Sequence, residues 1–396
     1  MTEEKKGFDV IMNERVLWDA LPTILMVLVQ FGFAGVNICY KLAAADGMSL
    51  RIIIAYRFLF ASVFILPIAF FLERGRRPKL TWSVLFYAFL SGLFGGSLSQ
   101  NLYVESLALT SATFASAIGN LVPGITLILA VSFRLERVNI RTKGGKAKVV
   151  GTLIGIGGAM VLTFYKGVEL HPWSTRVDLL HKSHQSSGHV AAPEHNIHSQ
   201  VLGSVLGVGS CFSYALWLIV QAKMSECYPC HYSSTALMCM MGSVQAVGFA
   251  LCVETQWTRW KLGWNIRLLS VAYTGIVASG AMATLITWCV RMRGPMFVSV
   301  FSPLILLLVS IAASLFLQEK LYLGCVVGGM LIVCGLYMVL WGKSKEMRKI
   351  TQLAPMESIE EQQLGGGIDL VISSPTTFPK TNVTSNNNAP HSNNNN

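Results

Sequence analysis

Apolar residues gather along this chain in ten blocks of about twenty, separated by shorter polar or charged segments. An α-helix needs about 20 residues to cross the roughly 30 Å hydrocarbon core of a bilayer. Each block is therefore predicted to be a membrane-spanning helix. The blocks cover residues 21–43, 50–72, 82–105, 112–133, 148–167, 201–222, 231–252, 267–289, 295–317 and 320–342.

Composition supports an all-α integral membrane protein. Hydrophobic residues make up 53% of the chain and charged residues 13%, and the mean hydropathy is +0.52. These values are too apolar for an ordinary soluble domain. The first 20 residues are polar and mixed in charge, unlike a cleaved signal peptide, so the first span is expected to remain in the mature protein.

The net charge of +11 indicates topology rather than nucleic-acid binding. If both termini are cytoplasmic, 20 of the 31 Lys and Arg residues lie on that side and nine on the other. This asymmetry follows the positive-inside rule and predicts cytoplasmic termini. No nucleic-acid partner is expected.

Two polar segments interrupt or follow the spans. Residues 168–199 form a non-cytoplasmic loop with six of the eight histidines, predicted to be a flexible linker in preference to a metal site. The tail, 346–396, ends in an Asn-rich stretch that cannot bury a core and is predicted to be disordered. The nine cysteines are interpreted as small apolar fillers, and the Cys-x-x-Cys at 227–230 as a polar turn rather than a redox or metal site.

An internal repeat organises the spans. Residues 92–138 align with 275–321 at a constant shift of 183, with nine identities. The shift superposes span on span, so residues 21–167 and 200–345 are predicted to be two copies of a five-helix unit. Because five is odd, the second copy enters the membrane the other way up, an arrangement typical of transporters.

The fourth span of each unit contains a proline, Pro123 in the first and Pro303 in the second. Both prolines lie beside a small polar residue, Asn120 or Ser302, and the shift places Asn120 over Pro303. Irregular backbone within a membrane is tolerated where it lines a cavity, so we interpret the prolines as gating bends. The alternative is that they serve helix packing alone.

Polar side chains at helical spacing form stripes that can face one shared interior. Trp217 and Trp288 either line a cavity or belong to an interfacial aromatic belt. The candidate pathway residues are Gln30, Asn37, Gln100, Asn101, Asn120, Trp217, Gln221, Thr284 and Trp288.

Arg57 is the one cation well inside a predicted span. A buried arginine suits a carboxylate, which the solute or the protein can provide. The two alternatives left open are a substrate carboxylate, and pairing with Glu105 or with helix-end carbonyls.

Several expected signatures are missing from the sequence. No Asp, Glu or His lies in the predicted middle of a span, which favours facilitated transport over a proton relay. The chain has no phosphate-binding Gly-x-x-x-x-Gly-Lys-Ser/Thr loop and no paired intramembrane aspartates. Neither an enzyme nor a cofactor is predicted.

The motifs QFGFAGVNICYKLA from residue 30, SLSQNLYVESLALTSATFASAIGNLVPGITLILAVSFRLERV at 97–138 and FSPLILLLVSIAASLFLQEKL from 301 resemble the plant nodulin-like EamA proteins. That family is also called the UmamiT or Walls-Are-Thin-related transporters, within the drug/metabolite transporter superfamily. The resemblance covers about residues 15–345 and implies two inverted five-helix EamA repeats. It also implies passage of amino acids by export or bidirectional transport, and auxin in some relatives.

The resemblance implies roles for individual residues. It places most of the candidate amides, Trp217 and both prolines in or near a central cavity, and it treats Glu136 and Glu319 as structural acids. Glu105 departs from the family pattern, where a neutral or aromatic residue is more usual.

The sequence therefore predicts an alternating-access carrier of small organic solutes, amino acids first, with the lipid bilayer as its surroundings and its oligomeric state left open. The plasma membrane is the first expectation and the vacuolar membrane the second. The alternatives are a carrier of auxin or another metabolite, and a membrane receptor or scaffold that uses the loop or the tail.

Overall fold

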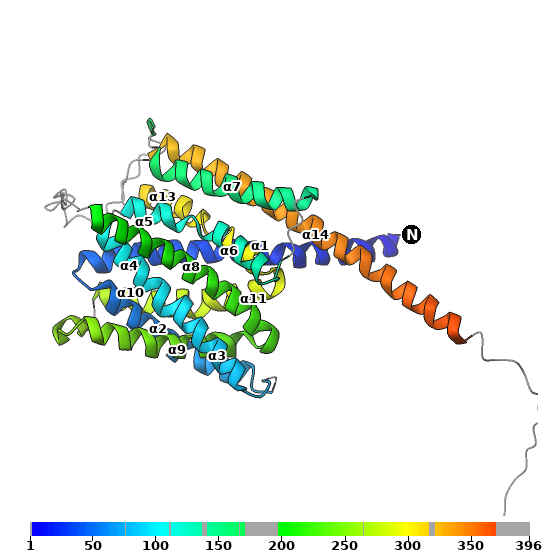
Figure 1. The fold of residues 1–396 in the computed structure, drawn as a ribbon, viewed down its shortest axis with the longest axis horizontal. Helices are drawn as coiled ribbons and strands as arrows, with labels where there is room; N and C mark the ends of the chain where they lie inside the picture. The colour runs from blue at the N-terminus through cyan, green and yellow to red at the C-terminus, as the bar shows by residue number, and fades with distance from the viewer. Residues whose placement is uncertain are drawn as a thin grey trace, which may run out of the picture. The chain divides into compact units, whose positions relative to one another are not determined.

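The computed structural model of the protein is almost entirely helical (Figure 1). It describes residues 2–75, 77–110, 112–136, 141–165, 167–170, 197–263, 265–316 and 321–369. Contacts divide the chain into a first unit, Met1–Ser344, and a second unit, Lys345–Asn396. Residues 345–369 are helical, and the predicted disorder of the tail, 346–396, stays a prediction. Of the predicted linker, 168–199, residues 171–196 lie outside the described residues, as does the tail from residue 370 onward.

The first half of the bundle contains five spans, several of them built from more than one segment. Its elements are α1 (Thr2–Ala45), α2 (Leu50–Leu72), α3 (Trp82–Ser91), the π-helix η1 (Gly92–Leu98), α4 (Ser99–Leu109), α5 (Ala112–Gly119), α6 (Val122–Ser132) and α7 (Lys143–Phe164).

The second half repeats this order. Its elements are α8 (Ile197–Cys227), α9 (His231–Val253), the 3₁₀ turn η2 (Trp257–Trp260), α10 (Ile266–Tyr273), the π-helix η3 (Thr274–Met282), α11 (Ala283–Arg293), α12 (Pro295–Ser299), α13 (Leu304–Phe316) and α14 (Leu323–Asp369). A two-residue antiparallel pair, β1 (Glu169–Leu170) and β2 (Leu321–Tyr322), joins the halves with Glu169 opposite Tyr322.

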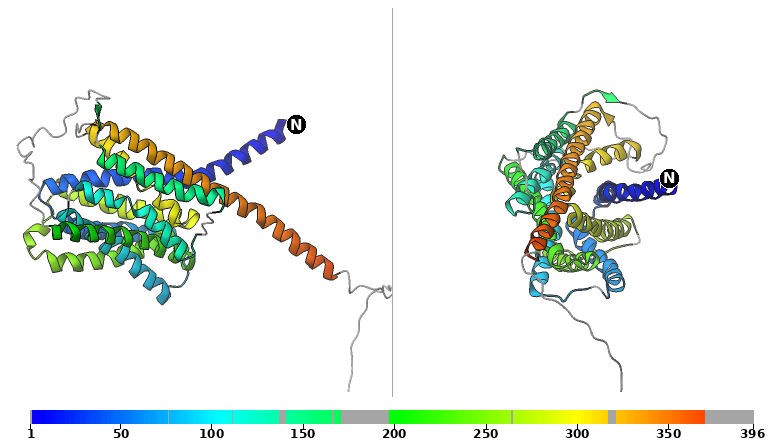
Figure 2. Two further views of the ribbon diagram at one scale, coloured as in Figure 1. Left: turned by 45° about the horizontal axis from the view of Figure 1, so that its top comes forward. Right: turned by 90° about the vertical axis from the view of Figure 1, so that its right-hand side faces the viewer.

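The ten predicted spans are confirmed. Among the described residues, eight helical stretches are long and apolar enough to cross a membrane, and two shorter apolar ones, Ala117–Ser132 and Pro295–Ile311, complete the set. The spans run in alternating directions along one long axis (Figure 2). We call the side where Glu73, Tyr228 and Gly294 connect spans the terminal side, and the side of Asp46 and Glu254 the loop side.

The second spans of the two halves, α2 and α9, pack against each other and cap each other. Glu73 follows α2, and its carboxylate accepts hydrogen bonds from the N–H groups of Tyr232 (3.1 Å) and Ser233 (2.8 Å) in the first turn of α9. At the opposite side Glu254 follows α9 and accepts a hydrogen bond from Ser49 Oγ, at the start of α2 (2.7 Å). A carboxylate at a helix N-terminus is favourable, so each acid stabilises the start of the neighbouring helix.

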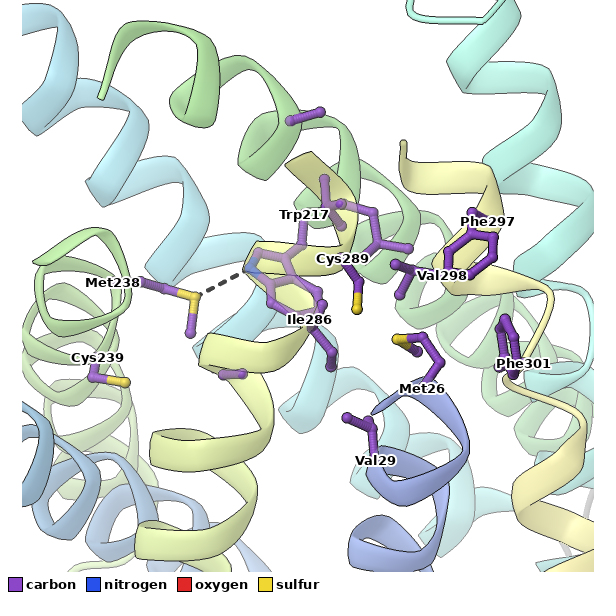
Figure 3. Packing of buried hydrophobic residues seen from close by; sticks show 14 of the residues in the cluster. Met26, Val29, Trp217, Met238, Cys239, Ile286, Cys289, Phe297, Val298 and Phe301 are labelled. Carbon is purple, nitrogen blue, oxygen red and sulfur yellow. Dashed lines mark hydrogen bonds between the residues drawn. The ribbon is translucent and has the colours of Figure 1, made fainter. Parts of the chain in front are cut away.

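The largest hydrophobic cluster lies in the terminal half of the bundle and joins both halves (Figure 3). Met26 and Val29 from α1 meet Ile286 from α11 and Phe301 from the segment after α12. The indole N–H of Trp217 points at the sulfur of Met238, 3.1 Å away. This cluster is the core of the bundle on the terminal side.

The fifth spans, α7 and α14, lie side by side in both figures of the fold and contact each other through glycines (Figures 1 and 2). A Cβ added at Gly328 would come within 2.6 Å of the carbonyl oxygen of Gly158, and one at Gly335 within 2.6 Å of that of Gly151. The two backbones therefore approach as closely as only glycine permits.

We expect Gly328→Ala to lower stability by about 1–3 kcal/mol, because α7 and α14 must separate to admit the methyl group. Gly157→Ala is the matched control, since a Cβ there meets nothing within 4 Å. The control removes only the helix penalty of glycine and should not destabilise. Thermal unfolding of both variants in detergent checks this, and equal midpoints would contradict the close contact.

Candidate functional site

Arg57 lies inside the bundle, about two turns from the loop side of α2, with 7% of its surface exposed. Its Nε donates a hydrogen bond to Ser279 Oγ of η3 at 2.6 Å. Its Nη1 donates to the hydroxyl of Tyr40 of α1 at 2.9 Å. A charged guanidinium at membrane depth is costly unless something compensates it, and two neutral hydroxyls do so only in part.

No carboxylate holds Arg57 among the residues that the structure describes. The alternative in which Glu105 pairs with Arg57 is wrong, because Glu105 forms its ion pair with Arg51. Arg51 lies near the loop-side end of α2, closer to the level of Glu105, and it is also 3.6 Å from Glu254. The described hydrogen bonds of Arg57 go to hydroxyls, not to helix-end carbonyls.

Other spans also reach the Arg57 centre. Cys239 of α9 donates to the carbonyl oxygen of Ser279 at 3.3 Å. Four elements from both halves, α1, α2, α9 and η3, therefore meet at Arg57 or at its partner Ser279. In α8, the rings of Tyr214 and Trp217 lie 5.2 Å apart.

Four of the predicted amides are buried inside the bundle rather than exposed to lipid. Gln30, Asn101, Asn120 and Gln221 are buried, and Asn37 and Gln100 are half-buried. Asn120 has a buried amide nitrogen with no hydrogen-bond partner. A buried polar atom without a partner is rare, so Asn120 retains capacity to bind a ligand or water.

Asn37 and Asn101 use their amide nitrogens in the same way. Asn37 Nδ2 donates to the carbonyl of Phe33 at 2.9 Å, and Asn101 Nδ2 donates to that of Ser97 at 2.7 Å. Each amide thereby turns its oxygen away from its own helix. The oxygen of Asn101 is buried and has no partner, so this side chain offers an acceptor.

Both ends of the Gln221 amide bond protein hydroxyls. Its oxygen accepts from Ser91 Oγ at 2.8 Å, and its nitrogen donates to Ser234 Oγ at 3.0 Å. This amide, 0% exposed, links α3, α8 and α9. In this conformation Gln221 bonds protein groups, so it could contact a solute only in another conformation. Its place on the pathway stays a prediction.

Trp217 and Trp288 pack in the same hydrophobic cluster. Trp217 is buried, and Trp288 packs against the same hydrophobic cluster from α11. Both therefore pack into the apolar core on the terminal side, and their place on the pathway stays a prediction. Thr284 is buried and donates to the carbonyl of Gly280 at 2.8 Å.

The fourth span of each half is broken where the prolines were noted. Residues 120–121 separate α5 from α6, and residues 300–303 separate α12 from α13. Pro123 occupies the first turn of α6, and Pro303 directly precedes α13. Both prolines therefore begin a helix, where a missing N–H costs nothing, rather than kinking its interior.

Glu136 follows α6 and is buried at the terminal side. Its carboxylate pairs with Lys148 of α7 at 3.4 Å and with Lys343 of α14 at 2.5 Å. The acid thereby links the first half to the last span. Its predicted counterpart, Glu319, lies outside the described residues.

Sequence reasoning missed the partners of the central cation. Tyr40 lies three residues after Asn37, on the same side of a helix, so helical spacing was a signal for it. Ser279 and Cys239 carried no such signal, because each is a small residue within an apolar stretch.

Ten membrane spans around buried amides and a buried cation define the class of polytopic membrane carriers. The model of the EamA-like transporter family matches the chain twice, at residues 21–164 and 201–341. The chain belongs to this family of membrane transporters. The two matches, one in each half, also confirm the duplicated architecture.

Curated relatives cover nearly the whole chain. WAT1-related protein At1g25270 of Arabidopsis thaliana is 43% identical over 88% of this chain and 96% of that relative. WAT1-related protein At1g68170 of the same plant is 46% identical over 82% of this chain and 90% of that relative. A solved crystal structure superposes with a TM-score of 0.59 at 16% identity, over 81% of this chain and 97% of that one, and shows the fold alone.

Proposed function

We propose that this transporter carries small organic solutes with a carboxylate group, amino acids first, by alternating access in export or bidirectional facilitated transport. The observation that carries the proposal is Arg57, a buried cation with two hydroxyl partners and no described carboxylate. A solute carboxylate completes its coordination with charge-assisted hydrogen bonds.

The orphaned amide atoms fit the rest of such a solute. The free oxygen of Asn101 accepts hydrogen bonds, as an ammonium group requires, and the free nitrogen of Asn120 donates them. Gln30, Asn37, Gln100, Trp217, Gln221, Thr284 and Trp288 complete the proposed pathway. Pro123 and Pro303, beside the two helix breaks, are the proposed gating bends, and Glu136 and Glu319 the structural acids.

The apolar cluster around Met26, Ile286 and Phe301 supports a path that is sealed on the terminal side in this conformation. Along α2, Ala61, Ile65 and Ala69 belong to the cluster and follow Arg57 toward that side. The basic residues of the terminal side make it the proposed cytoplasmic side. The plasma membrane is the first proposed location and the vacuolar membrane the second.

The second candidate solute is auxin or another aromatic carboxylate. The tilted rings of Tyr214 and Trp217, 5.2 Å apart in α8, favour it, because an aromatic wall and the Arg57 cation recognise both parts of such a molecule. A receptor or scaffold role predicts instead that deleting residues 171–196 and 370–396 abolishes function, whereas a carrier keeps its flux.

Purified protein in liposomes, offered a panel of labelled amino acids and labelled auxin, tests the proposal. We expect saturable uptake that the unlabelled acid inhibits and its amide, which lacks the carboxylate, does not. Uptake of auxin alone would select the second candidate. Equal inhibition by acid and amide would remove Arg57 from recognition.

Asn120→Ala is expected to lower flux by about 2–10-fold, the range of a lost neutral hydrogen bond of about 0.5–1.5 kcal/mol. Folding should be spared, because the lost amide nitrogen has no protein partner. Asn265→Ala, an exposed asparagine before α10, is the matched control. Unchanged flux in liposomes would remove Asn120 from the site.

A further inference from the structure

The third span of each half contains a π-helical segment at the same place. Shifting η1, residues 92–98, by the 183-residue repeat superposes it on residues 275–281, within η3. A π-helix is rare, and short π-segments within α-helices are frequent at functional sites. Its presence in both copies of a duplicated unit indicates a feature of the architecture rather than of one local sequence.

Each π-segment packs on the second span of the opposite half. A Cβ added at Gly92 of η1 would lie 2.6 Å from the backbone nitrogen of Gly242 in α9. A Cβ added at Gly275 of η3 would lie 2.8 Å from the carbonyl oxygen of Arg57 in α2. The glycines bring backbone against backbone, so both π-segments lie directly on the α2–α9 pair.

In each π-segment, one backbone carbonyl accepts a hydrogen bond from a polar side chain of the following helix. The two side chains occupy equivalent positions of the repeat. Asn101 donates to the carbonyl of Ser97 at 2.7 Å, and Thr284 donates to that of Gly280 at 2.8 Å. The repeat shift of 183 relates Asn101 to Thr284 and Ser97 to Gly280. Two different residue types therefore perform one task, which explains why the identity count of the repeat missed them.

The segment in the second half is also tied to the central cation. Ser279 of η3 accepts the hydrogen bond from Arg57 Nε, and its carbonyl accepts one from the Cys239 thiol. A solute carboxylate that binds the guanidinium competes with the Ser279 hydroxyl for its donors. Occupancy of the site thereby acts on the π-segment.

We propose that η1 and η3 are the paired hinges of the transport cycle, and that Ser279 is the positioning residue that couples solute binding to η3. Conversion of a π-turn to an α-turn changes the register of the following helix, α4 or α11, against the fixed α2–α9 pair. The inference rests on the proposed alternating-access function.

Hydrogen–deuterium exchange of the wild-type protein in nanodiscs tests the hinges without any substitution. We expect amides of residues 92–98 and 274–282 to exchange at least ten-fold faster than those of α2 and α9. A transported carboxylate solute, at saturating concentration, should change the rates at 274–282. If residues 92–98 and 274–282 exchange as slowly as α2, the hinge proposal is overturned, even if the protein transports solute in liposomes. If no solute is transported at all, the proposed function is overturned separately.

Ser279→Ala tests the coupling. We expect exchange at 274–282 to rise and to lose its response to the solute, with exchange at 92–98 unchanged. Ser62→Ala is the matched control, because Ser62 is a buried serine of α2 whose described hydrogen bond stays within its own helix, from Oγ to the Phe58 carbonyl at 2.7 Å. An unaltered solute response in Ser279→Ala refutes the coupling.

Deleting one residue provides a test by transport rate. Removal of Leu93 from η1 converts the π-turn to an α-turn and leaves α3 and α4 in register, so we expect a folded protein with at least ten-fold lower flux. Removal of Leu153, an exposed residue of the regular helix α7, rotates half a helix and should unfold the protein. A Leu93 deletion variant that folds and transports at the normal rate contradicts the hinge proposal. If the variant does not fold, the hydrogen–deuterium exchange rates of the wild-type protein test the proposal instead.

Discussion

Arg57→Gln is expected to reduce uptake of carboxylate solutes by about 10–100-fold while the protein remains folded. A hydrogen bond to a charged group contributes about 1.5–3 kcal/mol, and 1.4 kcal/mol corresponds to a factor of ten. Because no described carboxylate pairs with Arg57, its removal leaves no opposite charge buried alone. Uptake by liposomes at solute concentrations below KM measures the first effect, and thermal unfolding the second.

A matched control separates recognition from general electrostatics. Arg259→Gln removes an arginine that pairs with Glu254 at the loop side with 53% of its side chain exposed, and it should change uptake little. Arg57→Lys keeps the charge but loses the planar pair of donors, so we expect partial activity. If Arg57→Gln unfolds the protein as readily as it stops uptake, the arginine is structural.

The span architecture was predictable because hydrocarbon imposes a strong pattern on sequence. Twenty-residue apolar blocks located all ten spans, and the repeat shift related their two halves. The block at 82–105 nonetheless gave no sign of η1, because α- and π-helices place apolar residues on lipid equally well. Only backbone coordinates show the widened turn that begins at Gly92.

The sequence predicted which residues are buried at the candidate site, but not which residues they hydrogen-bond. Burial of Arg57 and Asn120 follows from the cost of exposing a charge or an amide to lipid. Their hydrogen-bond partners depend on how each helix is rotated about its axis. The helical spacing of polar residues defines that rotation only coarsely. Arg57 and Ser279 are 222 positions apart, so no local pattern relates them.

The reciprocal caps of α2 and α9 illustrate the same limit. Glu73 and Glu254 each end a span, where an acid normally reads as a solvated loop residue. Their carboxylates instead bond the start of the neighbouring antiparallel helix. Such a contact needs the spatial order of spans, which hydropathy does not contain.

Glu136→Ala is expected to be the most destabilising single substitution, at about 3–5 kcal/mol, the cost of removing one partner from a buried ion pair. Lys148 is 1% exposed and Lys343 lies on the other side of the same carboxylate, so the variant brings two ammonium groups together without the charge between them. The contact also joins α6 and α7 to α14, so its loss loosens the two halves from each other.

Two further variants identify the cause of that loss. Glu136→Ala combined with Lys148→Met removes both charges of one pair and should recover part of the stability, because an apolar side chain of similar length tolerates burial. Glu226→Ala removes an exposed acid, with 58% of its side chain accessible, from its pair with Lys223 and should cost at most about 1 kcal/mol. Thermal unfolding in the same detergent compares all three. Equal losses for Glu136→Ala and Glu226→Ala would show that Glu136 contributes no more than a surface charge. A double variant no more stable than Glu136→Ala would show that lost packing, not the charge of Lys148, limits stability.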